Sequence, residues 1–486
     1  MLLLGSASAG ASACVHAPAL HMRGPTITHG VQTGDVQDGH ALVWGRCDEP
    51  ARMLVEWSTS PSFRDGSTTV AGPVVGPATD GAGVVWLRGL PDAQRISYRV
   101  RFEREAARGT SQWRHGQFNT PRADRLRIAW TGDTCGQGYG RNPEWGGLRG
   151  YQAIAAAEPD LFVHVGDMIY ADNPILPEQT LPDGRVWRNV SDEHVARVAE
   201  SLADFRARFA YNLGDEHVQA LAAAVPITAL WDDHEVHNNW WPGQRLADDR
   251  YGERETSVLA ARAARAQREW TPIGGPTIHR VLHHGPLLDV VVVDVRAFRG
   301  ANDENRGGRR SMLGAGQAQW LIDTLRRSRA RWKIVACGCP LGLVVGDGPD
   351  RQEGFANGDG PPLGRERELA SVLEGIRGVT GVVWLTADVH YAAAHHYDPS
   401  RARFGSFDAF WEFVAGPIHA GSFGPNALDP TFGPEVRFQW APPPGAANLA
   451  PWDGLQSFGT VDVARDHLRV TLWGIDSLPR YAVDLA

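Results

Sequence analysis

Buried strands that end beside an acidic residue recur along the C-terminal two thirds of this chain. Six apolar segments are as continuously hydrophobic as strands covered on both faces, and segments with helical spacing separate them. This alternation predicts an α/β domain, and the sheets of such domains bind ligands beyond the carboxyl ends of their strands. The predicted strands are LRIAWTGD, LFVHVGD, ITALWDD, LLDVVVVDVR, WKIVACGCP and GVVWLTADVH.

Acidic side chains follow four of these strands and would meet at one edge of the sheet. A single Asp after a strand is usually a helix N-cap or a turn residue. Four coincident positions would raise one another's pKa through repulsion and desolvation, and bound cations would relieve this conflict. Carboxylates with one or two imidazoles suit Fe, Mn, Mg, Ca or Zn, and the mixture predicts two metal ions bridged by a shared aspartate. The residues concerned are Asp133, Asp167, Asp232 with Asp233, and Asp388 with His390.

Short strands separated by turn residues fill the N-terminal region, from about Thr26 to Phe118. The segments ALVWGRC, MLVEWSTS, GVVWLRGL, ISYRVRFE and WRHGQFNT have this character, and their spacing predicts a small β-sandwich. We expect a leader or truncated signal remnant over residues 1–23, a β-sandwich domain over residues 24–121, and the α/β domain over residues 122–486.

Charge and cysteine content exclude several classes of protein. The formal net charge of -8 argues against a nucleic-acid backbone as partner. The five cysteines include no CxxC pair and no zinc-finger spacing, so a disulfide framework is not expected. No segment approaches the roughly 20 apolar residues of a membrane span. The N-terminal MLLLGSASAGASACVHAPALHM is either the tail of an export signal or the disordered leader of a cytosolic protein.

An ordered set of motifs resembles the alkaline phosphatase D (PhoD-like) family of metallophosphoesterases, from about Thr26 to the C-terminal strands. The resemblance implies a calcineurin-like core, in which two sheets are flanked by helices, behind an N-terminal β-sandwich. It also implies hydrolysis of phosphate esters, monoesters or diesters, in the periplasm or outside the cell. The motifs are TGDTCGQGYGRNPEWGGLRGYQAI, HVGDMIYAD, LWDDHEVHNNW, GPLLDVVVVDVRAFRG, ANGDGPPLGRERELASVL and TADVH.

The resemblance also implies a ligand set. In the related purple acid phosphatase pattern, GDxxY makes Asp167 the bridge between two metal ions and Tyr170 a ligand of a ferric ion. DDHE and ADVH stand where simpler phosphoesterases have GNH[DE] and GHxH, which favours Ca²⁺ beside Fe³⁺, with Mn²⁺, Zn²⁺ and Co²⁺ as alternatives. Asn239 could replace Asn238, and Cys135 could instead be a buried thiol. The implied ligands are Asp133, Cys135, Asp167, Tyr170, Asp233, Asn238, Asp359, Asp388 and His390.

The expected reaction is in-line attack on phosphorus by a metal-bound hydroxide. His234 would hydrogen-bond the phosphate or protonate the leaving alkoxide, or else orient Asp233. Arg141, Arg296 and Arg299 are candidate clamps for the phosphate oxygens. Two other classes stay open: a surface binding protein with a vestigial core, and a metal hydrolase of another bond.

Overall fold

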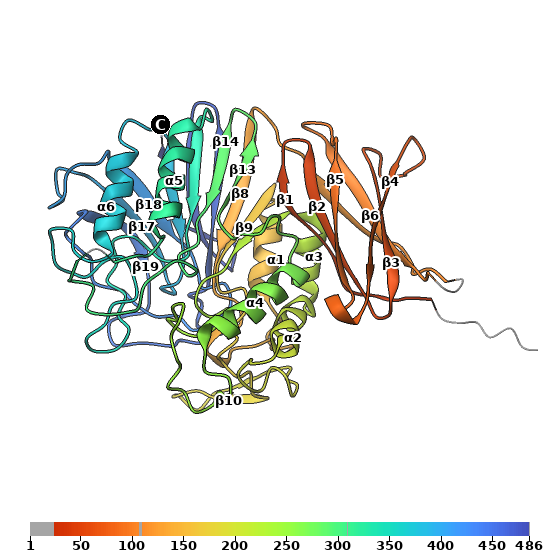
Figure 1. Ribbon diagram of the computed structural model, residues 1–486, viewed down its shortest axis with the longest axis horizontal. Helices are drawn as coiled ribbons and strands as arrows, with labels where there is room; N and C mark the ends of the chain where they lie inside the picture. Colours follow the sequence, from red (N-terminus) through yellow and green to blue (C-terminus); the bar gives the residue numbers. More distant parts are fainter. Residues whose placement is uncertain (1–23, 106–108, 309, 486) are drawn as a thin grey trace, which may run out of the picture.

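The computed structural model describes residues 24–105, 109–308 and 310–485, and three large sheets organise them (Figure 1). A nine-stranded sheet has the order β22-β21-β20-β8-β9-β12-β1-β2-β5, and a seven-stranded sheet has the order β13-β14-β15-β16-β18-β17-β19. A four-stranded sheet has the order β4-β3-β6-β7, and β10 pairs with β11 alone. The leader predicted for residues 1–23 lies outside the described residues.

The strands have the following bounds. Those of the nine-stranded sheet are β1 Ile27–Gln37, β2 His40–Cys47, β5 Ala82–Arg88, β8 Arg125–Thr131, β9 Leu161–Val165, β12 Ile227–Leu230, β20 Ser457–Ala464, β21 Leu468–Gly474 and β22 Pro479–Leu485. Those of the seven-stranded sheet are β13 Arg280–His284, β14 Leu288–Val292, β15 Trp332–Ala336, β16 Val382–Thr386, β17 Ala392–Tyr397, β18 Phe410–Val414 and β19 Pro434–Trp440. The others are β3 Ala51–Ser58, β4 Thr68–Val75, β6 Arg95–Glu103, β7 Arg114–Asn119, β10 Glu178–Thr180 and β11 Val186–Arg188.

Helices cover both outer sides of the two large sheets. In Figure 1, α5 and α6 lie beside the seven-stranded sheet, and α1 to α4 lie on the side of the nine-stranded sheet. Side chains of both sheets contribute to one shared core. None of the helices in the described ranges is long and apolar enough to cross a membrane. The helices are α1 Arg149–Ala156, α2 Leu202–Leu213, α3 Glu216–Ala224, α4 Thr256–Trp270, α5 Ala315–Arg327 and α6 Glu366–Gly375.

The six strands predicted from their apolar runs are β8, β9, β12, β14, β15 and β16. The first three are parallel neighbours in the nine-stranded sheet, and the last three are parallel neighbours in the seven-stranded sheet. All five residues of β9, β14 and β15 are buried, which explains why these strands show no alternation of polar and apolar residues. Their carboxyl ends bring the acidic loops of the two sheets to one place.

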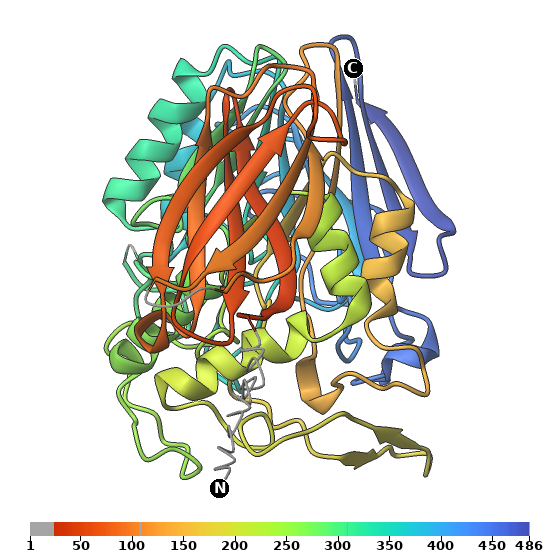
Figure 2. The same cartoon turned by 90° about the vertical axis from the view of Figure 1, so that its right-hand side faces the viewer.

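The N-terminal strands are partly merged with the site-bearing sheet. The four-stranded sheet packs on β1, β2 and β5, with one core between the two layers, and it faces the viewer in Figure 2. However, β1 also pairs in parallel with β12, at Gly34 and Ile227, so these strands extend the nine-stranded sheet. The sequence prediction missed β1 and β4. Most of β4 is exposed, and Gly72 and Pro73 interrupt it, so it lacks the pattern of a core strand.

Candidate metal centre

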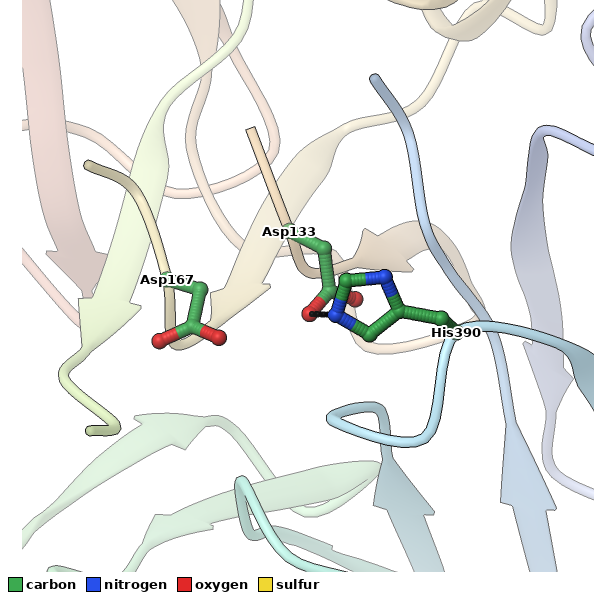
Figure 3. A group of neighbouring side chains, drawn as sticks. All are labelled: Asp133, Asp167 and His390. Atoms are coloured by element: carbon green, nitrogen blue, oxygen red, sulfur yellow. Dashed lines mark ion pairs between the residues drawn. The ribbon is translucent and has the colours of Figure 1, made fainter. Parts of the chain in front are cut away.

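Three side chains from three strand ends point toward one another in Figure 3. Asp133 follows β8, Asp167 follows β9, and His390 follows β16. The Nε2 atom of His390 lies 3.3 Å from Oδ1 of Asp133. The hydroxyl of Tyr170, which is 1 % exposed, lies 3.3 Å from the same oxygen and 3.0 Å from His390 Nε2. This group therefore combines carboxylate, phenol and imidazole donors around one point.

His390 has the tautomer that a metal ligand needs. Its Nδ1–H donates to the carbonyl oxygen of Gly421 at 2.5 Å, so the lone pair of Nε2 faces the carboxylates. Burial lowers the pKa of His390 to about 4, which keeps the imidazole neutral.

A second group shares Asp167 with the first. Asp167, Asp233 and His234 place one possible ligand atom each within 4.8 Å of one another, as do Asp133, Asp167 and His390. Oδ1 of Asp167 accepts the backbone N–H of His234 at 3.0 Å, and Asp233 Oδ2 lies 3.8 Å from His234 Nε2. Asp167 thus lies where a bridging aspartate would have to lie.

The donor set fits metal ions because one oxygen of each of three buried carboxylates accepts no hydrogen bond. Asp133 Oδ2, Asp233 Oδ1 and Asp388 Oδ2 accept no hydrogen bond within the described residues. Burial, together with neighbouring carboxylates, raises the pKa of Asp133 to about 8 and that of Asp167 and Asp388 well above the usual range. Buried unpaired carboxylates are costly unless a proton or a cation neutralises them. A pair of metal ions meets this need and uses every donor type present.

His234 is held as a cation beside these groups. Its Nδ1 bonds Asp172 Oδ1 at 2.8 Å, and its ring stacks on that of Tyr170 with centroids 4.1 Å apart. Burial alone would lower the pKa of His234, but Asp172 and Asp233 outweigh it and raise the pKa to about 9. Sequence reasoning missed Asp172, although it ends the quoted HVGDMIYAD motif.

A cavity of about 360 Å³ opens onto both groups. Asn238 and Asn239 both line it, so either amide can face a bound ion. Apolar side chains line it as well, among them Val345 and Phe423. None of the described residues that line this cavity is an arginine or a lysine.

The predicted phosphate clamps lie elsewhere. Arg141 stacks on the ring of Tyr211, 4.6 Å from its centroid, and does not line the cavity. Arg296 and Arg299 are buried among carboxylates, and both bind Glu353, at 2.5 Å and 3.0 Å. None of the three lines the cavity within the described residues, and Arg296 and Arg299 are already paired with carboxylates, so their role as phosphate clamps stays a prediction.

Two predicted ligands, Asp359 and Cys135, lie outside the possible metal groups of the described residues. The side chain of Asp359 is 49 % exposed and pairs with Arg306 at 3.3 Å, outside the ligand groups. Glu353, in the same loop, is fully buried and lines the cavity instead. Cys135 is 2 % exposed and packs in the hydrophobic core, where burial raises the pKa of its thiol, so the buried-thiol alternative describes its surroundings.

Glu235 is a further residue that sequence reasoning missed. It is 1 % exposed, and its carboxylate accepts the backbone N–H groups of Asp167 at 3.0 Å, Met168 at 2.7 Å and Asp232 at 2.8 Å. It thereby fixes the loop after β9 to the loop after β12. Its place in the WDDHE segment was the available signal.

Fold and site together define a metallophosphoesterase-like protein. The structure is similar to a solved structure of PhoD, with a TM-score of 0.69 and 20 % identity over 94 % of this chain and 88 % of that chain. It is also similar to a purple acid phosphatase from yellow lupin (Lupinus luteus) seeds, with a TM-score of 0.57 and 11 % identity over 96 % of this chain and 74 % of that one.

The chain belongs to the PhoD-like phosphatase family, whose model matches residues 128–472. The model of the N-terminal domain of PhoD-like phosphatases matches residues 13–122. This chain is 30 % identical to alkaline phosphatase D of Bacillus subtilis (strain 168) over 302 residues, which cover 58 % of this chain and 50 % of that protein. This chain therefore spans about half the length of that curated relative.

Proposed function

We propose that this protein hydrolyses phosphate esters at a two-metal centre built around Asp167. The observation that carries this proposal is that Asp167, Asp233, Asp388 and His390 line one cavity, with Asp133 and Tyr170 in contact with His390 behind them. Several of the buried carboxylate oxygens of this group accept no hydrogen bond within the described residues. A binding protein with a vestigial core would have no reason to keep so many buried carboxylates together, because they destabilise a fold unless cations neutralise them. The relative named alkaline phosphatase D supports this choice over hydrolysis of another bond.

The first ion would be held by Asp133, Tyr170 and His390. The second ion would be held by Asp233, Asp388 and either Asn238 or Asn239. Phenolate and carboxylate donors favour Fe³⁺ in the first position, and oxygen donors alone favour Ca²⁺ in the second, with Mn²⁺, Zn²⁺ and Co²⁺ as alternatives. When bound, such ions neutralise phosphate charge and activate water for attack on phosphorus.

The side chain of His234 would supply the proton for the leaving group, and its neighbours hold it in position. His234 lines the cavity, and its raised pKa of about 9 keeps it protonated at neutral pH. Nε2 is the free ring nitrogen, because Nδ1 is bound to Asp172, so Nε2 can donate a proton to the leaving alkoxide. Stacking on Tyr170 fixes the plane of the ring.

Chelation followed by reloading tests this function. Purified protein should hydrolyse a generic phosphomonoester or phosphodiester, lose this activity in excess chelator, and regain it with Fe³⁺ and Ca²⁺. Asp167→Asn keeps the shape of the side chain but removes the charge shared by both ions, so activity should fall by roughly 10³-fold or more and metal content should fall with it. A variant that retains both activity and metal would contradict the bridging role.

The finer architecture and the location belong to the same proposal. We assign residues 24–121 to an N-terminal β-sandwich and residues 122–486 to a calcineurin-like catalytic domain, supported by the layers of the fold. We propose that the protein is located in the periplasm or outside the cell, because the N-terminal segment of the sequence has the small residues of an export-signal remnant. Fractionation of the native host tests this location, and full-length protein confined to the cytosol would contradict it.

A further inference from the structure

Part of the wall of the cavity at the candidate metal centre is apolar and comes from three separate loops. Val345, Val389, Phe423 and Pro425 all line this cavity. Val389 and Tyr391 belong to one small hydrophobic cluster, and Val345 packs against that cluster. The cavity therefore has apolar side chains beside its carboxylates, and we call Val345, Val389, Phe423 and Pro425 the apolar face.

Hydrogen bonds hold the three loops of the apolar face together. The backbone N–H of Phe423 donates to the carbonyl oxygen of His390 at 3.2 Å, and the two rings meet edge to face with centroids 5.3 Å apart. Asn426 joins the other two loops, because its Nδ2 donates to the carbonyl oxygen of Val344 at 3.0 Å and its backbone N–H to the hydroxyl of Tyr391 at 3.3 Å. Phe423 is half-buried, so the apolar face presents a ring that is fixed in position and still reaches the cavity.

Cationic side chains are scarce in the same cavity. None of the described residues that line it is an arginine or a lysine. The proposed function assigns His234 to the leaving oxygen, and the charges of bound ions would be balanced largely by their own carboxylate and phenolate ligands. A second anionic group on the substrate would therefore lose its water in the cavity without gaining a partner, which weakens binding.

We propose that the apolar face receives the ester group of the substrate and that Phe423 determines which esters are accepted. The substrate class is a phosphate ester whose ester group is uncharged, and apolar or aromatic, where it enters the cavity. Burial of such a group against a fixed aromatic ring is favourable, whereas a charged group finds no partner there. This inference rests on the proposed function, because it concerns the substrate of the same site.

Two phenol esters that differ in charge but hardly in shape test the selectivity. The phenols of 4-ethylphenyl phosphate and 4-(carboxymethyl)phenyl phosphate are nearly equal in acidity, so the reaction at phosphorus is matched. The full-length, metal-loaded protein should have a kcat/KM roughly 10-fold higher for the ethyl ester. Calorimetric binding of the matching benzylphosphonates, which cannot be hydrolysed, should follow the same order. If only diesters are hydrolysed, the methyl diesters of the same two phenols are compared.

A lysine added to the cavity should weaken this preference. Gly346 lines the cavity, and its φ is not positive. A Cβ atom there would lie 3.7 Å from the carbonyl oxygen of Gly348 and 4.0 Å from that of Arg351, so Gly346→Lys has room for its side chain. The new cation should raise kcat/KM for the carboxymethyl ester relative to the ethyl ester by roughly threefold. Gly316→Lys is the matched control, because it adds the same charge on the exposed surface of α5, outside the cavity, and should leave the ratio unchanged.

Phe423→Ala tests the ring itself. It should lower kcat/KM for 4-ethylphenyl phosphate by roughly 10-fold, because the apolar ester group loses the surface it packs on. The value for glycerol phosphate, whose ester group is polar, should stay nearly unchanged. Metal content is measured in parallel, because the ring of Phe423 also contacts His390. Equal losses on both substrates would overturn the role of Phe423, since general damage to the centre affects every ester alike.

The outcomes also separate this inference from the proposed function. Equal kcat/KM values for the two phenol esters in wild type, or an unchanged ratio in Gly346→Lys, would overturn the inference and leave the proposed function standing. Failure of the metal-loaded wild type to hydrolyse any of these esters would overturn the proposed function, and this inference with it. If Phe423→Ala does not fold, the ratio in Gly346→Lys and the binding of the two phosphonates decide the question.

Discussion

Several of the proposed ligands have a positive φ, a backbone conformation that residues other than glycine rarely adopt. φ is 68° at Asp133, 54° at Asp167, 70° at Asp388 and 62° at His390. Such conformations cost on the order of 1 kcal/mol each and persist where the surrounding structure holds them. Asp133 and Asp167 each follow a buried strand, and Asp388 and His390 both follow a third, so three loops hold these four conformations at the strand ends.

Removing His234 should separate proton donation from metal binding. In His234→Ala, turnover should fall by roughly 10²- to 10⁴-fold because the leaving alkoxide loses its proton donor. Metal content should stay near the wild-type value, since Asp133, Asp167 and His390 are untouched. His237→Ala is the matched control, because His237 lies three residues on and faces Asp248 at 3.7 Å instead. Loss of metal from His234→Ala would assign His234 to the ligand shell.

If Tyr170 binds a ferric ion, the iron-loaded protein should absorb visible light. Burial and neighbouring carboxylates raise the pKa of Tyr170 well above its usual value, so without a strongly acidic metal ion it stays a neutral phenol. Iron-loaded protein should therefore absorb visible light by phenolate-to-iron charge transfer, and Tyr170→Phe should abolish the band while the fold survives. Tyr391→Phe, at another buried tyrosine, should leave the spectrum unchanged. Identical spectra of iron-loaded wild type and Tyr170→Phe would exclude the ligand role.

Among the elements, α6 begins at a buried carboxyl pair that anchors the loop carrying Glu353. Glu366, its first residue, accepts N–H bonds from Asn357 and Leu363, and Asp429 accepts those of Asn357 and Gly358. Burial raises the pKa of Glu366 to about 9, and its hydrogen bond to Asp429 adds to the rise. Burial would also raise the pKa of Asp429, but the same hydrogen bond lowers it. The pair therefore shares one proton at neutral pH.

Glu366→Gln should make the protein's stability less dependent on pH. The folded pKa of about 9 lies above the unfolded value of about 4.3, so wild type loses stability as pH rises from about 5 to about 9. The loss is at most about 1.4 kcal/mol per pH unit. Glutamine mimics the protonated acid and cannot ionise, so its advantage over wild type should grow with pH across this window. Urea unfolding at several pH values measures it, and the exposed Glu374→Gln should show no such trend.

In the molecule as a whole, the N-terminal strands and the site-bearing sheets form one connected unit. Asp35 of β1 is 1 % exposed and binds Arg280 of β13 through two contacts of 2.9 Å. It also accepts hydrogen bonds from Thr228 of β12 and the backbone of Gly274. One carboxylate thus ties the nine-stranded sheet to the seven-stranded sheet through the N-terminal strand.

Asp35→Ala should destabilise the entire protein. Arg280 would be left as a largely buried cation without its partner, which costs about 3–5 kcal/mol. Because β1 is continuous with the site-bearing sheet, thermal unfolding should remain a single transition at a lower Tm. Asp80→Ala, which breaks the more exposed pair with Arg46, should cost less than about 1 kcal/mol. Calorimetry measures both, and a separate early transition in wild type would show that residues 24–121 unfold independently.

The amino-acid sequence alone determined the elements that depend on local pattern. Apolar runs predicted β8, β9, β12, β14, β15 and β16, because a strand covered on both faces must be apolar throughout. The acidic residues after them marked the site, since the carboxyl ends of parallel strands meet at one edge. Asp133, Asp167 and His390 are brought together as that reasoning predicted.

Only the tertiary structure decided which charged side chains face the cavity. Arg296 and Glu353 are 57 positions apart, and a guanidinium after a strand looks the same in sequence whether it faces substrate or buried carboxylates. Glu353 and Asp359 lie in one loop, and only the packing of that loop buries the first and exposes the second. The merging of β1 with β12 likewise depends on a pairing across 193 residues, for which no local pattern exists. Burial and ion pairing over such distances are properties of packing, so local sequence carries no signal for them.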